Sequence, residues 1–432
     1  MTTQVQAKPV PWWREPTRGQ WAAFAAAWVG WVLDAFDFTI YILVMNDIAK
    51  EFNVSHAAVA GSLTLTLLVR LAGGAAAGWM ADRFGRKLPL MLSLLWFAAF
   101  DAAIFFAPTF TWVLVFRTLF GFGMGAEWTA GTAMAMESFP ARSRKIASGL
   151  LQAGWPVGFF LAAATAYFVV PAWGWRAMFL IAIAPALLVL PIRFLVPDEH
   201  NHAAPAASRG AIADLLVPAV RLRIVLGSLV MALGFVVYYG LTTTHSLIQL
   251  TELGLSKQTA FANVCWFQVG MLVGVVVAGM VANRYGVIAA LVAPALLMVP
   301  ALPLFVGAAP GLLTLGAFLG GALGAGYSGV TPVLVTGLFP EHVRARAIGL
   351  VYHVGALLAA FVPWGIPALA EETGWKLSSA VELVVGVGLV AMAAAVFALR
   401  RFLVPSDGEL ATATAPAGAP EASAAAAPAL AS

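Results

Sequence analysis

Apolar residues recur along this chain in long runs, and short polar stretches separate one run from the next. Twelve of the runs reach about 20 residues, the length that a helix needs to cross a hydrocarbon layer of about 30 Å. The pattern therefore predicts an all-α membrane protein with twelve transmembrane helices. The predicted spans are 21–45, 57–80, 88–107, 110–137, 145–169, 176–197, 222–248, 260–281, 287–307, 311–338, 346–369 and 378–403.

Ionisable residues interrupt the first four of these runs. A charge in the middle of a membrane helix costs about 3 kcal/mol unless it finds a partner or faces water. Charges kept at such depth are typical of proteins that move a charged solute or a proton. The six residues are Asp34, Asp37, Arg70, Asp101, Arg117 and Glu127.

Composition and charge agree with a membrane protein and exclude several other classes. Hydrophobic residues make up 61% of the 432 positions and charged residues 10%, whereas soluble domains are about a quarter charged. Most of the 24 Lys and Arg residues lie in loops on the side of the N-terminus, which predicts cytoplasmic termini and the cytoplasmic (inner) membrane. Topology thus explains the net charge of +4 without a nucleic-acid partner. One cysteine, Cys265, and no His/Cys cluster leave no expected metal site.

The chain repeats itself at an offset of about 200 positions. Phe139 and Arg144 recur as Phe339 and Arg344, and neighbouring positions match as well. Duplication of a six-helix unit explains this pattern, and parallel repeats of this kind are found in transporters. The predicted parts are a cytoplasmic segment 1–20, an N-terminal bundle 21–197, a cytoplasmic linker 198–221, a C-terminal bundle 222–403 and a disordered cytoplasmic tail 404–432.

The two halves differ in their buried charges. Asp34 corresponds to Phe235 and Arg70 to Met271, and the other charged positions have neutral counterparts too. We therefore expect the N-terminal half to hold the electrostatics of proton and anion, and the C-terminal half to supply neutral contacts.

Two motifs identify a family. Gly78, Asp82, Arg83 and Gly85 belong to a tight turn between the second and third spans, and this turn resembles the loop signature of the major facilitator superfamily. Arg117, followed by three closely spaced glycines, resembles the fourth-helix signature of the same superfamily, in which the arginine is associated with proton coupling. The resemblance covers residues 15–403. It implies two pseudo-symmetric six-helix bundles around a central cavity that opens alternately to each side.

A narrower resemblance rests on residues around Asp34 and Asp37, around Glu127 and Glu137, and before Gln152. These segments resemble the sialate:proton symporter family, which includes lactate/pyruvate and sialic acid permeases. Aromatic-acid:proton symporters share the paired aspartates. The resemblance implies a cytoplasmic gate, for which the candidates are Asp82, Arg83, Arg86, Glu137 and Arg144.

The buried charges suggest separate roles for proton and substrate. Asp34 and Asp37 share one helix face, where two carboxylates in a low dielectric do not both ionise easily, so one of them can carry a proton. Alternatively, one of them pairs permanently with Arg70. Arg117 either couples protons or forms a structural pair with Asp101, which lies at matching depth on the other arm of the hairpin between the third and fourth spans. The candidates for proton coupling are Asp34, Asp37, Glu127 and Arg117.

Arg70 is the sharpest candidate for substrate binding, because a guanidinium matches a carboxylate with two parallel hydrogen bonds. Glu127 or Asp37 would hold it until the substrate arrives. Neutral groups at similar depth could line the same cavity. The candidates for substrate binding are Arg70, Tyr41, Gln152, Tyr238, His245, Gln268 and His353.

The leading hypothesis is a symporter that imports an organic anion, a monocarboxylate, together with protons by alternating access. Aromatic-acid or sugar-acid symport, proton-driven efflux and solute sensing without transport are the alternatives. Efflux antiporters of the superfamily have a fifth-helix motif with Gly directly before Pro, whereas Trp155 separates Gly154 from Pro156 here.

The sequence does not predict an enzyme, because it shows no catalytic arrangement of residues. We expect a monomer whose partners are the anion, protons and the lipid bilayer. No cofactor is expected, because the proton gradient supplies the energy.

Overall fold

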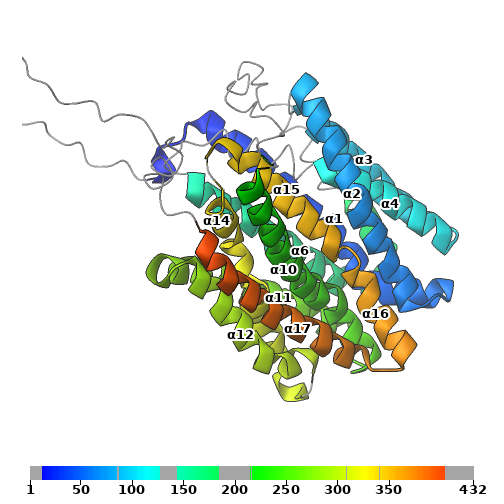
Figure 1. Cartoon of the computed structure of the whole chain (residues 1–432). Helices are drawn as coiled ribbons and strands as arrows, with labels where there is room; N and C mark the ends of the chain where they lie inside the picture. The colour runs from blue at the N-terminus through cyan, green and yellow to red at the C-terminus, as the bar shows by residue number, and fades with distance from the viewer. Residues whose placement is uncertain are drawn as a thin grey trace, which may run out of the picture.

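The structure is a computed structural model, and it describes residues 12–84, 87–126, 144–183, 215, 217–307, 309–339 and 341–403. Within these ranges the regular structure is helical throughout (Figure 1). The helices of the first half are η1 (Trp12–Arg14), α1 (Arg18–Phe52), α2 (His56–Phe84), α3 (Lys87–Phe105), α4 (Phe110–Ala126), α6 (Arg144–Trp173) and α7 (Ala177–Ile181).

The second half also consists of helices, and several of them are short. They are α10 (Pro218–Thr251), α11 (Lys257–Tyr285), α12 (Val287–Val306), η4 (Pro310–Leu312), α13 (Leu313–Gly324), η5 (Gly326–Gly329), α14 (Thr331–Thr336), α15 (Glu341–Ala359), α16 (Val362–Thr373), α17 (Leu377–Leu399) and η6 (Arg400–Phe402). The tail 404–432 lies outside the described residues, and so does the linker 198–221 apart from residue 215 and residues 217–221.

Most of the expected spans are present. Among the described residues, nine helices are long and apolar enough to cross a membrane, and two shorter apolar helices cover Met91–Phe105 and Phe110–Gly125. The sixth span, predicted over 176–197, can be followed only to residue 183. Eleven of the twelve predicted spans are thus represented by apolar helices in the described part of the chain.

Two expected spans are not continuous α-helices. The span 311–338 divides into α13, η5 and α14, and the span 346–369 divides into α15 and α16. Glycines at 320, 321, 324 and 326 weaken the first span, because glycine loses the most backbone freedom in a helix. Pro332 and Pro363 stand in the first turn of α14 and α16, where proline is tolerated because those amides have no partner within the helix.

Closely packed helix pairs hold the first half together. α6 lies against α1, α2 against α4, and α3 against α4. Gly158 shows how tight the first contact is, since a Cβ added there would lie 2.1 Å from the carbonyl oxygen of Val32. Small residues let membrane helices approach to backbone distance, where dispersion contacts stabilise the pair.

The two halves meet along a seam where α6 packs on α11 and α2 packs on α16, with α1 beside α10. Polar contacts close the seam at what we call the distal end, which holds the α1–α2, α10–α11 and α16–α17 turns and lies opposite the start of α1 and the end of α17 (Figure 1). Asp47 pairs with Lys257 there. Glu371 of α16 accepts a hydrogen bond of 3.0 Å from the Ala57 amide at the start of α2.

Candidate functional site

Asp34 and Asp37 are both buried in the middle of α1. The helix begins at a capping box in which the Thr17 hydroxyl and the Gln20 side chain each bind the other residue's backbone amide. It then continues without a break to Phe52, which keeps the two carboxylates three positions apart on one face. The expected pair of acids is therefore held by a rigid element.

Arg70 reaches from α2 toward the first of these acids. Its Nη2 lies 3.8 Å from the Asp34 carboxylate, and 12% of the Arg70 side chain remains exposed while Asp34 is fully buried. The sequence left Glu127, Asp37 or a permanent pair with one of the two α1 aspartates as partners of Arg70. The structure places Asp34 beside it, while Glu127 lies outside the described residues.

Arg117 and Asp101 form a second ion pair deeper in the same half. Their Nη1 and Oδ1 atoms are 3.2 Å apart and both side chains are fully buried, so the expected pairing is confirmed. Arg117 also donates to the backbone carbonyls of Asp37 at 3.5 Å and Phe38 at 3.3 Å. Its guanidinium lies 4.8 Å from the ring centre of Tyr41. Arg117 is thus fixed against α1 from several sides.

Asp37 lies between the two ion pairs. It interacts electrostatically with Asp34, Asp101 and Arg117. Its Oδ1 atom has no hydrogen-bond partner among the residues that the structure describes. A carboxylate in this position has a proton-accepting oxygen available and charged neighbours of both signs.

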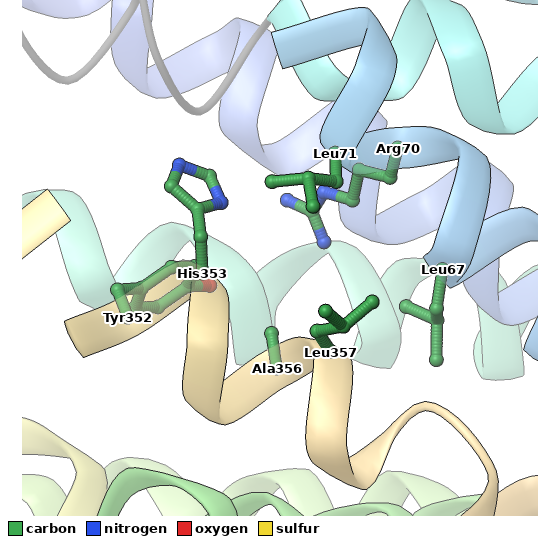
Figure 2. Close-up of a pocket in the computed structure, with 7 residues that line it drawn as sticks. All are labelled: Leu67, Arg70, Leu71, Tyr352, His353, Ala356 and Leu357. Carbon is green, nitrogen blue, oxygen red and sulfur yellow. The ribbon is translucent and has the colours of Figure 1, made fainter. Parts of the chain in front are cut away.

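A small cavity lies beside Arg70 at the seam between the halves. Its volume is about 20 Å³, enough for about one water molecule. Arg70 extends from α2, and His353 and Tyr352 extend from α15, so both halves contribute to the site (Figure 2). The lining residues are Leu67, Arg70, Leu71, Tyr352, His353, Ala356 and Leu357.

Aromatic rings continue the wall of this cavity into the second half. Phe235 stacks on Tyr239 at 5.5 Å with an angle of 14° between the ring planes, and it meets Tyr352 edge-on at 5.3 Å. Tyr239 and Tyr352 both lie close enough to Arg70 to interact with it electrostatically. The site thus joins one cation to several aromatic faces.

Other predicted lining residues lie elsewhere. The Tyr41 hydroxyl donates to the Val59 carbonyl at 3.4 Å. Buried His245 lies 2.9 Å from the Gln249 amide and stacks on Phe305, so its ring is held within the second half. Gln152 is half-buried on α6.

Tyr238 and Gln268 are both buried, but their polar groups differ in their contacts. The Tyr238 hydroxyl accepts from the Trp155 indole. Both amide atoms of Gln268 lack a hydrogen-bond partner within the described part of the chain.

The gate candidates can be described only in part. Arg86 and Glu137 lie outside the described residues, and the side chains of Asp82 and Arg144 are not described. Arg83 is exposed at the end of α2, with its guanidinium 5.9 Å from the ring centre of Trp79. The gate assignment therefore stays a prediction.

Sequence reasoning did not find Tyr352 or Trp155 as site residues. Both are aromatic residues inside apolar helices, where packing is the usual role, so composition carries no signal for them.

Comparison with known proteins gives a consistent picture. The family model of the Major Facilitator Superfamily matches residues 27–267, and that of the sugar (and other) transporters matches 224–419. The cis,cis-muconate transport protein of Acinetobacter baylyi is 30% identical over 389 residues, which cover 87% of this chain and 91% of the relative.

Further relatives include the gentisate transporter of Corynebacterium glutamicum, 30% identical over 78% of this chain and 79% of the relative. The sialic acid transporter NanX of Escherichia coli is 25% identical over 80% of this chain and 86% of its own length. A crystal structure of a D-xylose-proton symporter superposes with a TM-score of 0.74 at 21% identity, covering 86% of this chain and 97% of that one. The chain belongs to the major facilitator superfamily.

Proposed function

We propose that the protein is a proton-coupled symporter that imports an organic acid anion, and that the carboxylate of this anion binds Arg70. The observation that carries the proposal is the position of Arg70, which lies in a cavity lined by both halves and beside the buried Asp34. A guanidinium is the side chain best suited to hold a carboxylate with two hydrogen bonds.

Exchange at this ion pair links the anion to a proton. When a substrate carboxylate binds Arg70, Asp34 loses its counter-ion, and an unpaired carboxylate in this environment is costly. Protonation of Asp34 or of the adjacent Asp37 removes that cost. The anion and the proton therefore favour each other's binding, as symport requires.

The aromatic wall favours a planar, conjugated acid as the substrate. Tyr239 and Tyr352 lie close to Arg70, and Phe235 packs against both of their rings. Aromatic rings prefer offset-stacked or edge-to-face partners. Relatives named for cis,cis-muconate and gentisate support this choice over a small aliphatic acid such as lactate.

The orientation of the protein decides from which side the substrate reaches the cavity. With both termini in the cytoplasm of a cell and the protein in its inner membrane, the distal end faces outward. The described seam is closed at that end by Asp47 with Lys257 and by Glu371 with the start of α2. The two halves must separate to admit an acid, because the cavity of about 20 Å³ holds only about one water.

Uptake into proteoliposomes with an inward proton gradient tests the proposal. The screen compares benzoate, gentisate, cis,cis-muconate and lactate, and we expect gradient-driven accumulation of a conjugated acid. Asp34→Asn should abolish accumulation and retain part of the exchange between internal and external substrate, because exchange needs no net proton movement. Accumulation of none of the acids by the wild-type protein, or full accumulation by the variant, would refute the coupling.

A further inference from the structure

Trp155 makes a hydrogen bond that links the two halves of the molecule. Its indole Nε1 donates to the Tyr238 hydroxyl at 2.5 Å, which joins α6 to α10. Trp155 stands between Gly154 and Pro156 in the fifth span. A proline within a helix leaves one carbonyl without its usual donor and favours a local bend.

On the side of the first half, Trp155 is attached to the acid cluster through α1. Its ring lies 4.7 Å from that of Trp31 and 5.9 Å from that of Phe38. The Phe38 carbonyl accepts the hydrogen bond from Arg117 Nη2. Gly158 brings the α6 backbone against α1 one turn further along. A displacement of α1 near Arg117 is therefore passed to the Trp155 ring.

On the side of the second half, Tyr238 touches the wall of the substrate cavity. Its ring meets that of Tyr239 at 5.7 Å and 61°. Tyr239 stacks on Phe235 and interacts with Arg70. A change in the Tyr238 position therefore alters the aromatic faces that adjoin the cation.

We propose that the Trp155–Tyr238 hydrogen bond passes the protonation state of the first half to the substrate wall of the second half. Trp155 and Tyr238 are then positioning residues for coupling, and they contact neither the proton nor the carboxylate. The inference rests on the proposed proton-coupled function and assigns a contact to it.

The charged groups around the cluster give the physical reason for this transmission. Asp37 faces Asp34 on its own helix, Asp101 on α3 and Arg117 on α4. Protonation of an acid here changes the number of anions that share the Arg117 guanidinium, and hence how strongly it holds the α1 carbonyls. Among the described residues, the titratable groups that interact with Tyr238 are the tyrosines Tyr239, Tyr327 and Tyr352.

The test compares substrate binding at two pH values in purified wild-type and variant proteins. The probe is the acid that accumulates most in the uptake screen, and its Kd is measured at pH 6 and pH 8. Coupling between two sites is typically about 5-fold to 150-fold in affinity. We expect the ratio of the Kd at pH 8 to the Kd at pH 6 to fall below the wild-type value in Trp155→Phe and in Tyr238→Phe, with the Kd at pH 6 retained. The ratio should stay above one, because the direct exchange at Arg70 and Asp34 is untouched. The double variant should match the single ones, because each removes the same bond.

Two matched controls break hydrogen bonds of the same kind within one half. Trp28→Phe removes the indole donor to the Leu150 carbonyl, which joins α1 to α6. Tyr327→Phe removes the hydroxyl donor to the Gly234 carbonyl in the second half. Both should keep the wild-type ratio.

The outcomes separate the two proposals. A wild-type ratio in Tyr238→Phe, or an equal loss of affinity at both pH values, overturns the role of the hydrogen bond, since packing alone would act at both. Tyr238→Phe keeps the ring, so it remains informative if Trp155→Phe does not fold. A wild-type protein with neither pH-dependent binding nor gradient-driven uptake would instead refute the proposed function.

Discussion

Two ion pairs in the interior of the first half differ in how firmly they are enclosed. Arg117 and Asp101 are fully buried at 3.2 Å, and Arg117 has backbone and aromatic contacts besides. Arg70 and Asp34 are 3.8 Å apart, and part of Arg70 is exposed. The enclosed pair suits a permanent structural role, whereas the looser pair can exchange one partner for a ligand.

Arg70→Lys should weaken carboxylate binding by about 1–3 kcal/mol, because a point charge replaces a planar fork with two parallel donors. Calorimetric titration of the purified protein with the transported acid measures the loss. Arg284→Lys is the control, since Arg284 is an exposed arginine remote from the cavity lining. Wild-type affinity in both Arg70→Lys and Arg70→Gln would make Arg70 a structural ion only.

Asp101→Asn should lower thermal stability strongly, because it leaves the Arg117 charge buried without its carboxylate. Breaking a buried pair on one side costs about 3–5 kcal/mol. Thermal unfolding in detergent measures the effect, and a second change, Arg117→Gln, should recover part of it. A stability unaffected by Asp101→Asn would contradict the structural role.

Sequence position alone identified which charges matter, but not all of their partners. Asp101 and Arg117 could be paired in advance because they lie at equal depth on consecutive antiparallel helices. The pairing of Arg70 with Asp34 depends on how α2 is rotated against α1, and side-chain packing sets that rotation. Tyr352 gave no signal, because an aromatic residue in an apolar helix has the same pattern whether it packs or binds.

At the scale of helices, glycines set how closely neighbouring helices approach, and the sequence only partly predicts which glycines lie in such contacts. Gly121, which follows Arg117, lies at such a contact, because a Cβ added there would lie 2.4 Å from the Thr66 carbonyl oxygen on α2. The breaks in the spans 311–338 and 346–369 were not expected, because hydropathy measures the length of an apolar run and not its helical continuity.

Gly158→Ala should destabilise the protein by about 1–3 kcal/mol, the usual cost of overpacking. Its new methyl group would meet the Val32 carbonyl oxygen at 2.1 Å and push α6 away from α1. Gly149→Ala, in the same helix, is the control, because an added Cβ there meets no atom of the described residues within 4 Å. Equal melting temperatures for the two variants would show that the α1–α6 contact is looser than described.

At the scale of the molecule, the repeat persists at the distal end while the interior has diverged. Glu51 binds Trp175 and Arg176 before α7. Glu252, its counterpart in the second half, accepts from the Ser378 amide at the start of α17. The repeat and the plan of twelve helices were predictable because they rest on hydropathy and periodicity. The contacts that close the seam were not, because they join residues such as Asp47 and Lys257 that are far apart in the chain.

Lys257→Met should favour arrangements in which the distal end is open, because it removes the ion pair with Asp47. The pair is partly exposed, so the shift should be modest, at about 1 kcal/mol or less. Spin labels attached at Thr109→Cys and Ser379→Cys, in a Cys265→Ser background, report the distance between the halves.

Two comparisons complete this experiment. Glu51→Gln breaks a pair within one half and should leave the distance distribution unchanged. Exchange of the two charges, Asp47→Lys with Lys257→Asp, should restore the closed population. An unaltered distribution in Lys257→Met would mean that other contacts hold the seam.

The ion pair of Arg70 with Asp34 also determines how the carrier responds to membrane voltage. In the proposed exchange, a monocarboxylate neutralises the arginine and a proton neutralises the aspartate, so the site has zero net charge both empty and loaded. Moving one elementary charge across 100 mV changes the energy by about 2.3 kcal/mol, but here no net charge moves in either direction. Uptake of benzoate should then follow the pH difference and stay constant when a potassium diffusion potential is imposed. A doubly charged acid carried with a single proton would, in contrast, make uptake slower as the interior becomes more negative.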